Sequence, residues 1–260
     1  MTTTQKFLIA FFTVWSVVSL AGPRIQNAAN YFHNIREDIA WFETAERSLP
    51  PDDRRQLFLR IYHSVTLEMP NMFAEKQFHH PEWVNALMLK YVSLYRNALD
   101  CELTSQCEVS PAWQVAFSEN QRGRITPAGQ LLISISAHVN RDLPVALASI
   151  PTTRFEDPTY KADFERISLI FQRRMPVLIK LVQHYETCHI NRLDEKIIRR
   201  VIQFAIGRTR DKSWNWGAKL AQVKSSAEES NMMLQIEKHA HLENRSIYIF
   251  SPAPAFAICL

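Results

Sequence analysis

The sequence predicts an all-α protein, an orthogonal multi-helix array in a single domain that follows an N-terminal signal peptide. Apolar residues recur at helical spacing along most of the chain, and period-two alternation is convincing only over residues 246–250. Five glycines among 260 residues nearly exclude glycine-rich phosphate loops and glycine-dependent hairpins. The roughly 240 residues after the leader suit one large domain or two small ones, and no linker or internal repeat divides them.

Residues 1–21 have the composition of an export signal. Lys6 is the only charged side chain of a short n-region, and residues 7–20 form an apolar stretch of h-region length. Small residues stand where a signal peptidase would cut after Ala21. An uncleaved membrane anchor is an alternative, although the stretch is short for a span of ~20 residues. A buried N-terminal helix is the third interpretation, and the cleaved signal is the favoured one.

The four cysteines fit an oxidising compartment. Cys101 and Cys107 bracket a polar loop between two helical stretches, so we expect a local disulfide there. The sequence leaves open whether Cys188 pairs with Cys259. With the leader, this pattern predicts a secreted or periplasmic protein, or one anchored by an uncleaved N-terminal helix. No second transmembrane segment is evident.

Proline and acidic residues mark the predicted helix starts in the first half of the chain. The first helix is expected over residues 23–48, whose apolar residues recur at helical spacing. The Pro-Pro-Asp-Asp segment 50–53 caps a second helix, which stops near Pro70. Pro81 opens a third helix with an aromatic and aliphatic stripe as far as Ala98.

The second half continues the same pattern. Pro111 starts a short helix, and a polar loop over 119–124 precedes a helix over 128–141. Further helices are predicted over 160–190 with an interruption at Pro176, over 191–205 with an extension to 220, and over 225–242. The predicted helical domain therefore covers residues 22–245. An apolar C-terminal tail at 246–260 either docks on the domain or is disordered, and its role stays open.

The basic balance does not predict nucleic-acid binding. The formal net charge is +4, and paired basic residues such as Arg54-Arg55 and Arg173-Arg174 are dispersed among acidic and apolar neighbours. That pattern is typical of solvated helix faces. A nucleic-acid interface would need a denser basic stripe with exposed aromatic side chains, and no such patch is evident.

His138 and Asp142 are the strongest candidates for a functional role. They stand four residues apart, so on a helix both side chains lie on one face, one turn apart. An imidazole and a carboxylate in this arrangement can ligate one divalent metal. They can also hydrogen-bond to each other, which orients the ring and raises its basicity. The structural alternative is a buried histidine whose bond to Asp142 only ties helix ends together.

A metal site would need more than this pair. Zinc, the divalent metal expected first, takes three or four ligands, so the others must come from distant helices. His63, which lies beside an apolar stripe, is the candidate third ligand. We therefore name His138, Asp142 and His63 as candidate metal ligands, and His138 and Asp142 as candidate catalytic residues.

The segment ISISAHVNRDLPVAL, residues 133–147, resembles the signature of an uncharacterised all-helical domain family found in bacteria. Members look alike around an Ala-His-(Ile/Val)-Asn-x-Asp-Leu core. Weaker similarity at residues 61–66, 83–98 and 208–220 extends the resemblance to roughly residues 55–220. The resemblance implies a related fold and brings no established activity. At His63 this chain departs from the usual pattern, which weakens that residue as a ligand.

A more distant likeness is to the zinc-dependent phospholipase C and single-strand nuclease superfamily, whose members are exported and all-α. The shared feature is a His-x-x-x-Asp helix followed by proline, here His138, Asp142 and Pro144. Those proteins carry another histidine soon after the aspartate, and Leu143-Pro144-Val145 offers none. A trinuclear zinc site is therefore expected to be incomplete.

Two hypotheses follow for function. The first is an exported metal-dependent hydrolase in which His138 and Asp142 bind zinc or act as an oriented general base on a small-molecule, lipid or phosphoester substrate. The second is a non-catalytic helical binding or interaction protein in which the same pair is a structural hydrogen bond. Whether a metal is bound discriminates between them.

Overall fold

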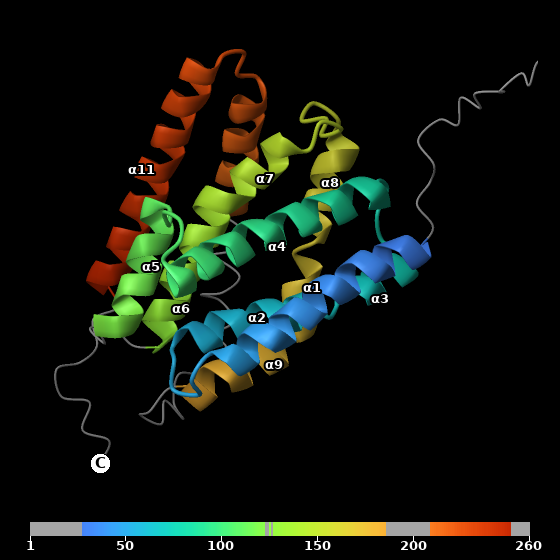
Figure 1. Cartoon of the computed structure of the whole chain (residues 1–260). Helices are drawn as coiled ribbons and strands as arrows, with labels where there is room; N and C mark the ends of the chain where they lie inside the picture. Colours follow the sequence, from blue (N-terminus) through green and yellow to red (C-terminus); the bar gives the residue numbers. More distant parts are fainter. Residues whose placement is uncertain (1–27, 123–124, 126, 186–208, 251–260) are drawn as a thin grey trace, which may run out of the picture.

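The computed structural model describes residues 28–122, 125, 127–185 and 209–250, and they form an all-helical single domain (Figure 1). The predicted leader at 1–21 lies outside the described residues, as do Cys188 and Cys259. Among the described helices, none combines the length and the apolar composition that crossing a bilayer requires. The all-α prediction is confirmed.

Four helices form the first half of the domain: α1 (Ala28–Ser48), α2 (Arg55–Thr66), α3 (Met69–Ala74) and α4 (Pro81–Thr104). The prediction that the second helix stops near Pro70 is wrong, because α2 ends at Thr66 and Pro70 lies in the first turn of α3. A proline is tolerated there, since the first N–H groups of a helix have no intrahelical partner. Helix α2 packs between α1 and α9.

The middle of the chain contains α5 (Pro111–Arg122), α6 (Pro127–Ala137), a π-helix η1 (His138–Asp142) and α7 (Leu143–Ser149). The loop predicted over 119–124 is too long, because α5 continues to Arg122. The helix predicted over 128–141 is regular only to Ala137, and the candidate segment after it takes the wider π form.

The last part contains α8 (Pro158–Arg166), α9 (Leu169–Tyr185), a helix over residues 209–221 and α11 (Ser226–Phe250). The long helix predicted from 160 breaks after Arg166, not at Pro176, which lies inside α9. Pro176 is exposed, so water can satisfy the carbonyl that its ring leaves free. Residues 186–208 of the predicted helices lie outside the described ranges.

The C-terminal tail does not begin at residue 246, because α11 continues through residues 246–250. Ile247 packs against the core, so the helix gains burial there. The period-two alternation of residues 246–250 does not mark the end of the helix, because it is too short to interrupt a helix that has already run for five turns. Residues 251–260 lie outside the described part.

One disulfide was predicted and is present, between Cys101 of α4 and Cys107 in the loop that follows. It closes the chain back on the end of α4, where Ser105 adopts a left-handed conformation with φ of 55°. The bond and this turn together fix the direction in which the chain leaves the helix.

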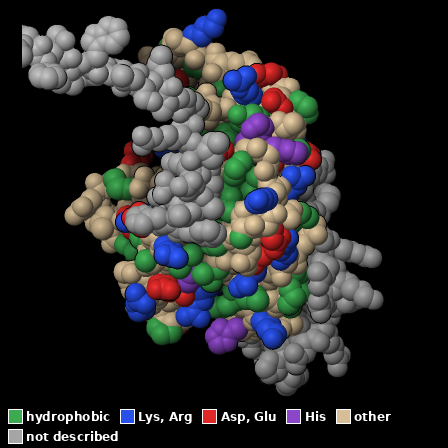
Figure 2. Space-filling model, turned by 90° about the vertical axis from the view of Figure 1, so that its right-hand side faces the viewer, with side chains coloured by type: hydrophobic (Ala, Val, Ile, Leu, Met, Phe, Trp, Pro, Cys, Tyr) green, Lys and Arg blue, Asp and Glu red, His purple; other side chains and the backbone are tan. Residues whose placement is uncertain are grey.

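The helix over 209–221 approaches α7 closely at Gly217. A Cβ atom added to Gly217 would lie 2.9 Å from Leu147 Cβ and 3.3 Å from the Pro144 carbonyl oxygen. Only a residue without a side chain allows this spacing. The close approach also brings Ser213, one turn earlier in the helix over 209–221, against Val139. On the face shown in Figure 2, Lys and Arg side chains are interspersed with Asp and Glu over a partly apolar surface.

Candidate functional site

The π-helix η1 carries the candidate residues in a turn that is one residue wider than an α-turn. The Leu143 N–H bonds to the His138 carbonyl, five residues back, as this geometry requires. Ser213 from the helix over 209–221 donates its hydroxyl to the Val139 carbonyl at 2.6 Å. The Val139 carbonyl, which lies within the π-turn, thus has a side-chain hydrogen-bond donor.

The structure brings His138 and Asp142 into direct contact. His138 Nδ1 lies 2.9 Å from Asp142 Oδ2, and both side chains are buried. An ionised carboxylate only accepts hydrogen bonds, so we assign the proton of the neutral ring to Nδ1. The ring nitrogen Nε2 then carries the lone pair.

Asp142 is fully buried and receives two further hydrogen bonds. Trp113 Nε1 donates to Oδ2 at 2.9 Å, and Arg141 Nη1 donates to Oδ1 at 2.9 Å. The Arg141 guanidinium also bonds to Glu237 of α11 at 2.8 Å. Asp142 therefore ties η1 to α5, and through Arg141 to α11. Its oxygens are already engaged, so ligating a metal would disrupt these bonds.

The His138 ring lies among aromatic side chains. Tyr91 of α4 stacks on it with ring centroids 3.6 Å apart and an interplanar angle of 9°, and the Tyr62 ring approaches at 4.7 Å. Burial lowers the pKa of His138, and the hydrogen bond to Asp142 opposes that shift only in part. The imidazole is therefore neutral at pH 7, and Nε2 is a hydrogen-bond acceptor.

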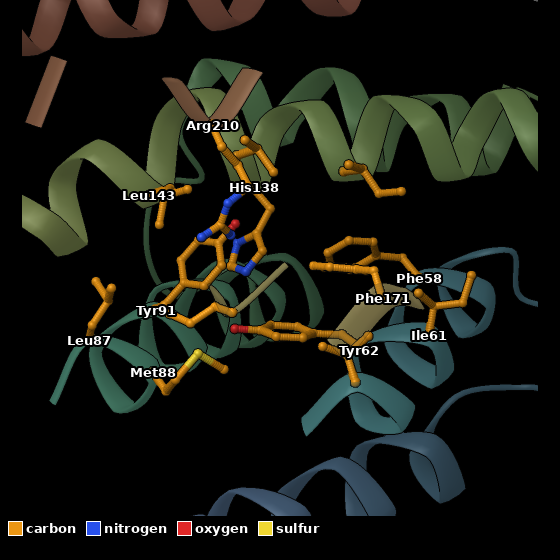
Figure 3. A pocket seen from close by; sticks show the side chains of 14 residues that line it. Phe58, Ile61, Tyr62, Leu87, Met88, Tyr91, His138, Leu143, Phe171 and Arg210 are labelled. Atoms are coloured by element: carbon orange, nitrogen blue, oxygen red, sulfur yellow. The ribbon is translucent and has the colours of Figure 1, made fainter. Parts of the chain in front are cut away.

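A cavity of about 60 Å³ lies beside this ring, between α2, α4 and η1 (Figure 3). In Figure 3, Tyr91, His138 and Arg210 lie together on one side, and Tyr62 extends toward them from α2. Most of the wall is apolar, with further side chains from Phe58, Ile61, Val65, Leu87, Met88, Ile135, Val139, Leu143, Ile167 and Phe171. An apolar pocket with a few convergent polar groups is the usual form of a small-molecule site.

Two polar atoms of this wall are buried and have no hydrogen-bond partner among the described residues: His138 Nε2 and the Tyr62 hydroxyl. Other buried atoms of the described residues also lack a partner, but none of those belongs to a residue that lines this cavity. A buried polar group left unpaired costs about 1–3 kcal/mol, so two at one cavity need a physical explanation.

Among the described residues that line the cavity, Arg210 is the one with a charged side chain. It is buried, donates to the Phe164 carbonyl and lies 4.0 Å from the centroid of the Phe164 ring. Burial lowers the pKa of Arg210 to about 10, which still leaves it protonated at pH 7.

His63 is not part of this site. Its Nδ1 bonds to Glu46 Oε1 at 2.6 Å and its ring stacks on Phe42 at 5.5 Å, away from the cavity wall. No group of three potential ligands of the His, Cys, Asp and Glu types comes together within the described ranges. The described residues therefore do not fit a trinuclear zinc centre.

The sequence indicated the histidine–aspartate pair and missed the other polar groups of the cavity. Tyr62 and Tyr91 stand in the predicted apolar stripes of their helices and gave no separate signal. Arg210 belongs to the late arginine- and tryptophan-containing segment, where its burial was not foreseen. A helical arginine is normally solvated, so only the packing reveals it.

A family model described as a family of unknown function (DUF5995) matches residues 35–249. The match includes every residue of the pocket wall and extends beyond the segment of roughly 55–220 that carried the resemblance. Neither the curated proteins nor the solved structures contain a significant match to the chain.

Proposed function

Since the chain belongs to this family of unknown function, we propose from its pocket that the domain binds a small, largely apolar molecule that carries a hydrogen-bond donor. The observation behind the proposal is that His138 Nε2 and the Tyr62 hydroxyl are buried at an apolar cavity and find no partner in the described part of the chain. A ligand hydroxyl or N–H group would supply the bond that neutral His138 lacks.

The apolar wall and the unpaired polar atoms of the pocket would contribute to binding in different ways. The apolar wall gains free energy as it excludes water from the body of the ligand. The unpaired polar atoms give orientation and specificity, because a ligand without a donor leaves His138 Nε2 unsatisfied. A cavity of about 60 Å³ supports a small molecule as the ligand, in preference to a whole lipid.

Tyr62→Phe tests the proposal with two readouts. No described group bonds to the Tyr62 hydroxyl, so its removal should raise the free energy of unfolding by about 1 kcal/mol. The same change should weaken binding of 2-butanol, a probe with one donor and a short apolar body, followed by NMR chemical-shift titration. Tyr95→Phe is the control, because Tyr95 is a buried residue of α4 that does not line the cavity.

Two results would contradict the proposal. One is the absence of saturable 2-butanol shifts at the cavity up to concentrations of about 0.1 M, given that so small a ligand binds only in roughly the micromolar to millimolar range. The other is a Tyr62→Phe variant that binds 2-butanol as well as the wild type. In that case the hydroxyl has no part in ligand recognition.

The second candidate function is general-base catalysis by His138 in a hydrolase. It is favoured by the bond from His138 Nδ1 to Asp142, which orients the ring and leaves Nε2 free to accept a proton. Hydrolysis of 4-nitrophenyl butyrate by the wild type, lost in His138→Gln at unchanged stability, would support it. Equal rates in the two proteins would exclude His138 as the base for this ester.

The zinc-dependent form of the hydrolase stays a prediction. The lone pair of His138 Nε2 could bind a metal. Asp142, however, accepts three hydrogen bonds, and His63 bonds to Glu46 away from the cavity. Metal analysis of the purified chain, with a thermal-shift assay in zinc, manganese and calcium, tests it. Secretion or periplasmic export stays a proposal too, supported by the Cys101–Cys107 disulfide.

A further inference from the structure

The charge of Arg210 is not balanced by any ion pair among the described residues. The two carboxylates that act on it from nearby are Glu165 and Asp211. Both are largely exposed, and both bond to Lys161, at 3.7 and 2.6 Å. The one described hydrogen bond of the Arg210 guanidinium is to the neutral carbonyl of Phe164. Within the described part of the chain, most of the five donors of this guanidinium are thus unused.

An unbalanced charge is costly where Arg210 lies. Buried charges in proteins are paired or hydrogen-bonded, because transfer of an ion from water to an apolar surrounding is strongly unfavourable. The Phe164 ring face offsets part of this cost through a cation–π contact at 4.0 Å. An anion entering the adjoining cavity would supply what the described residues do not.

The neighbours of Arg210 also favour an anion of planar, oxygen-rich form. Figure 3 shows Tyr91 beside the guanidinium, on the same cavity wall. A hydroxyl can donate to a carboxylate oxygen, and the guanidinium fork matches both carboxylate oxygens. His138 Nε2, with its lone pair, would repel a carboxylate and attract a hydroxyl.

We propose that the pocket takes a short-chain aliphatic hydroxycarboxylate, with its carboxylate on Arg210 and its hydroxyl on His138. This inference rests on the proposed binding function and names the ligand class. The cavity of about 60 Å³ limits the chain, since it has room for about four to six water-sized groups. A hydroxycarboxylate of three or four carbons has six or seven non-hydrogen atoms, which is close to this limit, and longer chains exceed it.

Three matched ligands separate the two polar contacts. The first, 3-hydroxybutyrate, carries both groups, butyrate lacks the hydroxyl, and 2-butanol has a methyl group in place of the carboxylate. Dissociation constants are measured on the full chain at pH 7 by NMR titration or calorimetry. We expect 3-hydroxybutyrate to bind the wild type about tenfold or more tightly than 2-butanol, because a bidentate charge-assisted contact is added.

Arg210→Met should remove that advantage, so that 3-hydroxybutyrate and 2-butanol bind the variant with affinities within about twofold of each other, since methionine keeps the apolar packing. Arg210→Lys keeps the charge without the planar fork, so it should give an intermediate affinity for 3-hydroxybutyrate. Arg173→Met is the control, because Arg173 pairs with Glu75 at 2.7 Å outside the cavity wall. It should change none of the three affinities.

The outcomes distinguish this inference from the function on which it rests. If 2-butanol binds as tightly as 3-hydroxybutyrate, the carboxylate contact is overturned and the binding function stands. If none of the three ligands binds, both are overturned. If Arg210→Met does not fold, the ratio of wild-type affinities and the Arg210→Lys variant still decide the matter.

Discussion

Replacement of Asp142 by asparagine should destabilise the domain by about 3 kcal/mol. The carboxylate is fully buried and accepts from Trp113, His138 and Arg141, each at 2.9 Å. An asparagine oxygen at the Oδ2 position can still accept from Trp113 and His138. Its amide group then faces the Arg141 guanidinium, donor against donor.

The magnitude follows from what Arg141 loses. A hydrogen bond to a charged partner contributes about 1.5–3 kcal/mol, and the removal of one partner from a buried ion pair costs about 3–5 kcal/mol. Arg141 keeps its bond to Glu237, which limits the loss to the lower end of that range. For a domain of this size, 3 kcal/mol corresponds to a fall in Tm of roughly 6–12 °C.

Urea denaturation and calorimetry of Asp142→Asn measure this loss directly. Asp211→Asn is the matched control, because the same change there removes a charge that is exposed and paired with Lys161, with 69% of the Asp211 side chain accessible. That variant should lose less than about 1 kcal/mol. The reasoning is refuted if the two variants have equal free energies of unfolding, since the charge of Asp142 would then contribute nothing to the network.

Three other changes have defined outcomes. Burial raises the pKa of Asp38 to about 6 from 3.8, so the folded state holds a proton that the unfolded state releases. Stability should therefore fall as pH rises from 4 to 7, by less than about 3 kcal/mol because solvent screens the partly exposed carboxyl. Urea denaturation at the two pH values measures the fall, and Asp38→Asn should abolish it. Gly217→Ala should destabilise by about 1 kcal/mol net, because the contact 2.9 Å from Leu147 Cβ outweighs the better helix propensity; a more stable variant in calorimetry would contradict this. Substitution of both Cys101 and Cys107 by alanine should cost about 2 kcal/mol of loop-closure entropy, and equal denaturation midpoints would exclude this contribution.

Local chemistry explains which parts of the fold the sequence predicted. Helix starts at Pro81 and Pro111 follow from the fixed φ of proline. The start predicted at 160 is two residues late, because Pro158 opens α8 and the Asp157 carboxylate caps it by accepting the Thr159 N–H at 2.9 Å. Such signals lie within a few residues of the feature they specify. The break after Arg166 has no comparable signal, because it depends on how α8 and α9 pack.

The candidate site was predictable only where its residues are close in sequence. The spacing of His138 and Asp142 indicated their contact, since four residues bring side chains together on a helix. Trp113 is distant in sequence from Asp142, and Arg210 lies far from Tyr91, so tertiary packing alone joins them. The π-form of η1 was also hidden, because its sequence fits an α-helix equally well.

The wide turn of η1 makes the length of this segment as important as its composition. Helices α6 and α7 run through residues 138–142 without a loop, and the π-turn between them holds one residue more than an α-turn. Deletion of a single residue between His138 and Asp142 would therefore restore a regular α-turn and leave α7 close to its present phase. Leu143 would stay on the cavity wall and Leu147 would stay against Gly217. The spacing of His138 and Asp142 would shorten from four residues to three, so we expect such a deletion to disturb this pair more than the packing of α7.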